Sequence, residues 1–184
     1  DLYYTTSVSI TNNTGTMIPE MYYYRNVDPD NDESLSLDYS TTNTIVSEPG
    51  TGCDLAHVSA TQTTPWNNYL GLAAIGANWR ATFGGFTNRD GSDLWNLTGS
   101  YFPALTQTVG ASTFDDDAIS LAYKIQNLAP GATETFKFVV ILDAASATAA
   151  INNLLYLQYP GSLTAPPPVC TTYSDSVKTC GSAV

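Results

Sequence analysis

Short stretches of alternating polar and apolar residues recur along the chain, and turn-forming residues separate them. Such alternation is typical of strands that bury one face, whereas a surface helix repeats its apolar residues three and four positions apart. Thr and Tyr, which favour strands, abound, while the Glu and Lys that surface helices use are scarce. The sequence therefore predicts an all-β fold, an antiparallel β-sandwich.

Eight segments carry the strand pattern. They are residues 8–11, 18–25, 42–47, 56–60, 69–75, 77–83, 119–125 and 134–142. The last two form the clearest pair, because Pro130 sets the first dihedral of a turn between them and Gly131 supplies the left-handed one. We expect an antiparallel connection there.

One short helix is expected near the C-terminal end of the domain. Asp143 can cap it, residues 144–150 are rich in the strong helix former Ala, and Ile151, Leu154 and Leu155 form an apolar stripe. From Pro160 onward the chain is rich in proline. We therefore expect a β-sandwich module over residues 1–160, with a linker and the start of a following repeat over 161–184.

The charge of the chain limits its partners. Seventeen acidic and six basic residues give a net charge of −11, which repels nucleic acid and anionic lipid surfaces. No apolar run approaches the roughly 20 residues that span a bilayer. The chain opens with polar, β-prone residues and not with a basic and then apolar leader, so we expect a mature or excised fragment of a secreted protein.

Three cysteines fit an extracellular chain without fixing their pairing. Cys170 and Cys180 lie close together and could bridge, which leaves Cys53 single. Alternatively, Cys53 pairs with Cys170, and Cys180 belongs to the module that follows. Both arrangements stay open at this point.

Sequence signals for catalysis are weak. The single histidine, His57, lies on a predicted strand, and no nucleophile elbow, zinc-protease helix or phosphate-binding glycine loop is present. We interpret His57 as a structural residue and expect no enzyme. Glycoside processing by two of the thirteen aspartates is a second alternative function.

Acidic residues gather in a few turns, and this is the strongest functional pattern. Asp28, Asp30 and Asp32 alternate with single residues directly after a tyrosine-rich strand, and Glu33 follows. Ca²⁺ prefers six to eight such hard oxygen ligands in flexible geometry. The loop is not an EF-hand, because Glu33 stands where the turn glycine belongs and Tyr39 where the bidentate glutamate belongs.

Two further acidic groups could join this loop. One directly precedes the predicted strand at 119–125, and the other lies in a polar turn that begins at Asn88. Solvated turns are the alternative interpretation of all three groups. The predicted Ca²⁺ ligands are Asp28, Asp30, Asp32, Glu33, Asp90, Asp93, Asp115, Asp116 and Asp117.

The tryptophans lie beside Asn, Arg or Pro, and flat rings next to amide or guanidinium groups are typical of carbohydrate recognition. Packing in the core is the alternative interpretation. The chain also has few arginines, which favours a pairing or anion-recognising role for them. The predicted ligand-binding residues are Trp66, Trp79, Arg80, Arg89 and Trp95, and a carbohydrate-binding module is the first alternative function.

Five segments carry a resemblance to a known family. They are residues 23–32 (YYRNVDPDND), 41–47 (TTNTIVS), 66–72 (WNNYLGL), 84–90 (GGFTNRD) and 127–131 (NLAPG). Together they resemble a β-rich module of large, repetitive secreted surface proteins of Bacteroidota, including gliding-type adhesins. The similarity covers roughly residues 2–159, and the tail is similar to the start of the repeat that follows such modules.

This resemblance implies export to the cell surface, a multidomain protein, and adhesion or ligand capture. It carries no catalytic residues over to this chain. Combined with the acidic loops, it leads us to expect a calcium-binding module of a secreted surface adhesin. Its expected partners are a cell-surface glycan or protein, neighbouring domains or further copies of itself.

Overall fold

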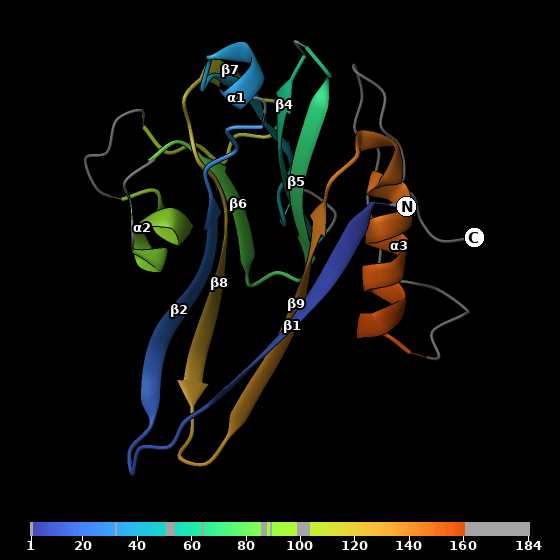
Figure 1. The fold of residues 1–184 in the computed structure, drawn as a ribbon. Coiled ribbons are helices and arrows are strands. Elements are labelled where there is room, and N and C mark those ends of the chain that lie inside the picture. The colour runs from blue at the N-terminus through green and yellow to red at the C-terminus, as the bar shows by residue number, and fades with distance from the viewer. Residues whose placement is uncertain are drawn as a thin grey trace.

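The computed structural model of the protein describes residues 2–31, 33–50, 54–63, 65–85, 88, 90–98 and 104–160. It is a β-sandwich of antiparallel strands with a short helix near the end of the domain, as the sequence predicts (Figure 1). None of the helices in the described ranges is both long and apolar enough to cross a membrane. The elements are β1 (Tyr3–Thr11), β2 (Ile18–Val27), α1 (Glu33–Ser36), β3 (Thr41–Ser47), β4 (Leu55–Gln62), β5 (Asn68–Ile75), β6 (Trp79–Phe83), α2 (Gly91–Asn96), β7 (Ser112–Asp115), β8 (Ile119–Leu128), β9 (Thr133–Ile141), the 3-10 turn η1 (Ala144–Ser146) and α3 (Ala147–Gln158).

Two sheets build the sandwich. The larger sheet has the order β1-β9-β5-β4-β3-β7, and the smaller one has the order β2-β8-β6. Strands β3, β4 and β5 form a meander, while the other six connections between consecutive strands all cross between the sheets. Strand β7 is one edge of the larger sheet and consists of four residues.

The turn between β8 and β9 corrects an expectation from the sequence. It is a tight turn, with Gly131 in the left-handed region and the Ala132 amide donating to the Ala129 carbonyl. However, β8 pairs with β2 and β6, whereas β9 pairs with β1 and β5. The turn therefore carries the chain from one sheet to the other, because local turn chemistry reverses the chain without choosing the strand's partner.

The main core lies between the two sheets and is rich in aromatic rings. Trp79 on β6 is 1% exposed and contacts Tyr23, Tyr123, Phe136 and Phe138 at ring-centroid distances of 4.7–6.5 Å. These rings come from both sheets, so their packing fixes the sheets face to face. Large buried rings make a major contribution to such cores.

A second core lies on the other face of the larger sheet, under α3 (Figure 1). Leu154 is fully buried there against Ile75, Val139 and Ile141, and Ile151 and Leu155 pack at its margin. This confirms the predicted apolar stripe. It also explains the unbroken apolar run at the end of β9, because that strand is buried on both faces.

Several expectations fall on residues outside the described ranges. These are Asp32, Arg89, all three cysteines and the expected linker of residues 161–184.

Candidate metal centre

The pairing of β2 with β8 brings two acidic segments of the chain together. Val27 and Ile119 are opposite each other at one end of this pair. Asp28 directly follows β2, and Asp116 shortly precedes β8, so both segments leave the sheet at the same end. Two groups that are far apart in sequence thereby meet through strand register alone.

Three carboxylates converge at this end. Asp28, Asp30 and Asp116 each offer an oxygen, and these oxygens all lie within 4.8 Å of one another. Two ligands about 2.4 Å from a Ca²⁺ ion are at most about 4.8 Å apart, so the spacing fits one ion shared by all three. All three side chains are exposed, which leaves room for water and backbone carbonyls as further ligands.

The loop that carries Asp28 and Asp30 is fixed on both sides. Pro29 between them is buried. The Asn31 amide group donates to the Ala60 carbonyl of β4 at 3.5 Å, and the Asn31 backbone N–H donates to the Pro29 carbonyl at 2.5 Å. The acidic loop is therefore held against the larger sheet.

Glu33 and Tyr39 extend the cluster. The charge of Glu33 and a hydrogen bond to it raise the pKa of the Tyr39 phenol, and the charges of Asp30 and Asp116 add to this effect. The phenol therefore lies beside the carboxylates. From the sequence alone, Tyr39 was used only to exclude an EF-hand. No pattern in the residues around Tyr39 predicted that it would lie next to this cluster.

Repulsion within the cluster is visible in Asp116. Partial burial and then the charges of Asp30 and Asp115 raise the pKa of this carboxyl. Asp115 itself accepts the Asp116 backbone N–H at 2.9 Å and is not one of the three converging groups. A divalent cation would offset this repulsion, because an opposite charge favours the ionised carboxylate.

Asp117 differs from its neighbours in being 1% exposed. Neither carboxylate oxygen has a hydrogen-bond partner among the described residues. Burial, followed by the charges of Asp115 and Asp116, raises the pKa of this carboxyl to about 6. A buried carboxylate without donors is costly, and a bound cation is one way to offset that cost.

Asp90 and Asp93 have local roles on α2. The Asp90 carboxylate accepts the Ser92 backbone N–H at 2.8 Å and so caps the helix. The Asp93 carboxylate accepts the Thr98 hydroxyl at 2.7 Å. Neither residue belongs to the group that converges on a common point.

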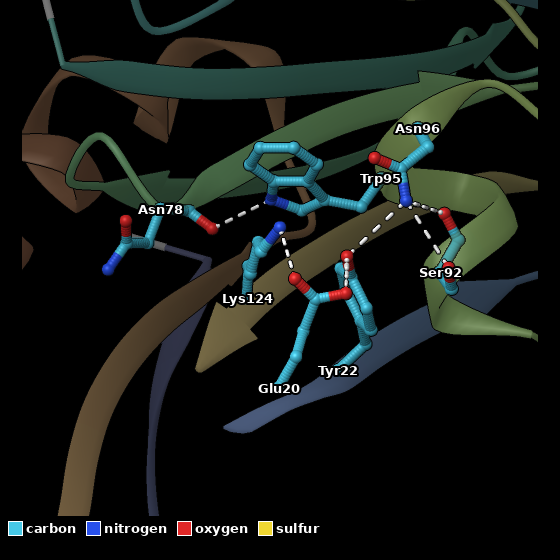
Figure 2. Close-up of polar contacts among 7 residues, drawn as sticks. All are labelled: Glu20, Tyr22, Asn78, Ser92, Trp95, Asn96 and Lys124. Atoms are coloured by element: carbon cyan, nitrogen blue, oxygen red, sulfur yellow. Dashed lines mark hydrogen bonds and ion pairs between the residues drawn. The ribbon is translucent and has the colours of Figure 1, made fainter. Parts of the chain in front are cut away.

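Two of the predicted ligand-binding residues, Trp95 and Arg80, join α2 to the smaller sheet. The Trp95 indole N–H donates to the Asn78 carbonyl at 3.0 Å, as Figure 2 shows. The Arg80 guanidinium lies 4.4 Å and the Lys124 ammonium 4.9 Å from the centre of a Trp95 ring. These cation–π contacts attach the helix to the sheet.

Polar contacts beneath this indole complete the attachment (Figure 2). Lys124 forms an ion pair with Glu20 at 2.5 Å, and the Tyr22 hydroxyl donates to the same carboxylate at 2.7 Å. The Asn96 amide group on α2 donates to the Tyr22 hydroxyl at 3.4 Å. The cluster therefore binds the helix to β2 and β8 as well as to β6.

The other two predicted ligand-binding residues within the described ranges, Trp79 and Trp66, differ in their exposure to solvent. Trp79 is a core residue whose ring is surrounded by aromatic neighbours, so it offers no face to a ligand. Trp66, in contrast, is 69% exposed. His57 is 2% exposed and its Nε2 lies 3.1 Å from the Tyr69 hydroxyl, which agrees with a structural role.

Comparison with known proteins adds no family to this description. No protein-family model matches the chain, and no curated protein matches it.

Proposed function

We propose that this protein is a calcium-binding β-sandwich module of a secreted, multidomain surface adhesin. The observation that carries the calcium part is the convergence of Asp28, Asp30 and Asp116 within 4.8 Å at one end of the sandwich. Oxygen is the only ligand element there, as a hard cation requires.

Two further observations support a cation. Partial burial and then the charges of Asp30 and Asp115 raise the pKa of Asp116, and a bound cation would offset both effects. Asp117, the next residue in the chain, is buried without a hydrogen-bond donor among the described residues, although it is not one of the three converging carboxylates. The ion would fix the loop after β2 to the segment before β8 and so make this end of the molecule rigid.

Calcium titration tests the proposal. A ligand at about 100 times its dissociation constant stabilises the folded state by about 2.7 kcal/mol, or roughly 5–10 °C in melting temperature for a domain of this size. We expect Ca²⁺ added after chelation to raise the melting temperature by this order, and Mg²⁺ to raise it less. An unchanged melting temperature would contradict the proposal.

Variants locate the ion. Asp30→Asn and Asp116→Asn remove one charged ligand each and should abolish most of the calcium-induced shift. Asp54→Asn is the matched control, because Asp54 is an exposed aspartate outside the cluster. An equal loss in all three variants would indicate nonspecific binding to an acidic surface.

The adhesin and cell-surface parts of the proposal depend on composition and on the resemblance of five segments to surface-protein modules. Antibody labelling of intact, unpermeabilised cells of the source organism tests them directly. Labelling only after permeabilisation would contradict the surface location while leaving calcium binding open to its own test.

A further inference from the structure

A groove with a volume of about 300 Å³ lies next to the acidic cluster. It shares two elements with that cluster, since α1 begins at Glu33 and β7 ends just before Asp116. The volume lies at the lower end of the range of about 300–1,000 Å³ for small-ligand sites. Its lining residues are Leu35, Ser36, Asp38, Gln62, Thr63, Pro65 and Phe114.

The apolar side chains of the groove are unusually open to solvent. Phe114 is 64% and Leu35 62% exposed. Trp66, which follows the lining residue Pro65, is 69% exposed. A group of exposed apolar residues framed by polar ones is typical of a binding surface.

The polar side chains of the groove are fixed in advance. The Gln62 amide group donates to the Ser36 hydroxyl at 3.0 Å and to the Asp38 carbonyl at 3.1 Å, which attaches α1 to the end of β4. Hydrogen bonds from Ser40 lower the pKa of Asp38. This carboxylate is therefore ionised near neutral pH and can accept a hydrogen bond from a ligand hydroxyl.

Charge selects among possible ligands. Asp38 and the neighbouring cluster are acidic, so an anionic ligand is repelled. The groove instead offers aromatic and aliphatic surface beside an ionised carboxylate and hydroxyl groups. A sugar ring complements this set, because its C–H face packs on an aromatic ring and its hydroxyl groups donate to carboxylates.

We propose that this groove binds a neutral oligosaccharide, with Phe114 as the stacking ring and Asp38 as a hydrogen-bond acceptor. This deepens the proposed function by naming the ligand class, and it rests on that function only in taking the module to capture a ligand. The groove itself needs no ion.

Affinity electrophoresis tests the inference on the full chain. The probes are three neutral polysaccharides (laminarin, galactomannan and xyloglucan) and two anionic ones (alginate and polygalacturonate). We expect at least one neutral polysaccharide to retard the protein and neither anionic one to do so. Retardation by no neutral probe, or a stronger effect of the anionic probes, would overturn the inference.

Matched variants assign the groove. Phe114→Ala and Leu35→Ala should weaken binding to the retarding polysaccharide, the first by roughly tenfold or more, with an unchanged melting temperature because both side chains are exposed. Tyr156→Ala is the control, since Tyr156 is 61% exposed and belongs to α3, which lies apart from α1 and β7 in the fold (Figure 1). Equal effects of Phe114→Ala and Tyr156→Ala would reject the groove.

Two comparisons distinguish the oligosaccharide inference from the calcium proposal and from a cationic peptide as the occupant of the groove. If calcium raises the melting temperature but no neutral polysaccharide binds, the groove inference fails and the calcium proposal stands; the reverse outcome rejects calcium and supports the groove. Poly-L-lysine tests a cationic peptide as the occupant. The sugar assignment would be overturned if the protein bound poly-L-lysine but no neutral polysaccharide, and if Phe114→Ala weakened the binding of poly-L-lysine.

Discussion

Glu48 follows β3 and shows how a single residue can link stability to pH. Its side chain is 6% exposed, and its Oε1 accepts the Ala81 backbone N–H of β6 at 2.5 Å. Burial raises the pKa of this carboxyl to about 8, although the hydrogen bond from Ala81 and the charge of Arg80 act in the opposite direction. The folded protein therefore holds a proton on Glu48 that the unfolded chain releases at lower pH.

The sign of the pH effect follows from this shift. Because the folded pKa is above the unfolded value of 4.5, the contribution of Glu48 to stability is complete below about pH 4.5 and is lost as the pH rises through about 8. Glu48→Gln keeps an acceptor for Ala81 without the titration. We expect the variant to gain on the order of 3–4 kcal/mol over the wild type between about pH 5 and pH 8.

Urea unfolding across this pH range measures the difference in free energy of unfolding between the two proteins. Other groups titrate equally in both, so the difference isolates Glu48. A difference that does not change with pH would contradict the assignment.

Helix α2 is held in place by its N-terminal cap and by its close packing on β2. Besides the Asp90 cap, a Cβ added to Gly91 would lie only 3.0 Å from the Tyr22 Cβ, so the helix packs very closely on β2. Asp90→Ala should therefore lower the free energy of unfolding by about 1 kcal/mol through loss of the cap. Asp90→Asn, which can still cap, should lower it much less.

The same pair of variants separates capping from metal binding. If Asp90 only caps α2, both variants bind Ca²⁺ as tightly as the wild type in calorimetric titration. Weaker calcium binding in Asp90→Asn, whose helix cap is intact, would instead place Asp90 among the ligands.

The elements differ in how well the sequence predicted them. All eight predicted strands are found, with shifted ends, because their alternating or continuous apolar patterns extend over enough residues to be recognised. Helices α1 and α2 and strand β7 were not predicted, since four to six residues are too few for a period to emerge. The partners of β8 and β9 depend on long-range packing that their shared turn does not encode.

For the candidate site, too, the sequence predicted the local features but not those that depend on long-range packing. The acidic loops were identified from composition, but the choice of Asp28, Asp30 and Asp116 over the other aspartates depends on the register of β2 against β8. The groove was missed, although Phe114 beside three aspartates and Leu35 between serines are apolar residues in polar segments. That mismatch was the available signal.

At the scale of the whole molecule, repulsion between like charges opposes folding. The net charge is −11, and among the described residues Lys124 forms an ion pair with Glu20. Salt shortens the screening distance from about 20 Å at about 20 mM to about 4 Å at about 500 mM. We therefore expect sodium chloride over this range to raise the melting temperature by a few degrees in the presence of a chelator.

Differential scanning fluorimetry checks this expectation, and sucrose at matched osmolality controls for effects of cosolute. A melting temperature that falls with salt would mean that favourable ion pairs outweigh the repulsion. The same series gives the ionic-strength baseline against which the calcium titration must be read.

The brevity of β7 has a consequence for how neighbouring molecules meet. A sheet edge is a template on which a second chain can add its own strand, and an exposed phenylalanine makes the template stickier. Here the edge is four residues long and ends in Asp115, with two more aspartates directly behind it. Negative residues at such a tip are typical gatekeepers, so we expect the edge that carries the exposed Phe114 to resist pairing with a strand of another molecule.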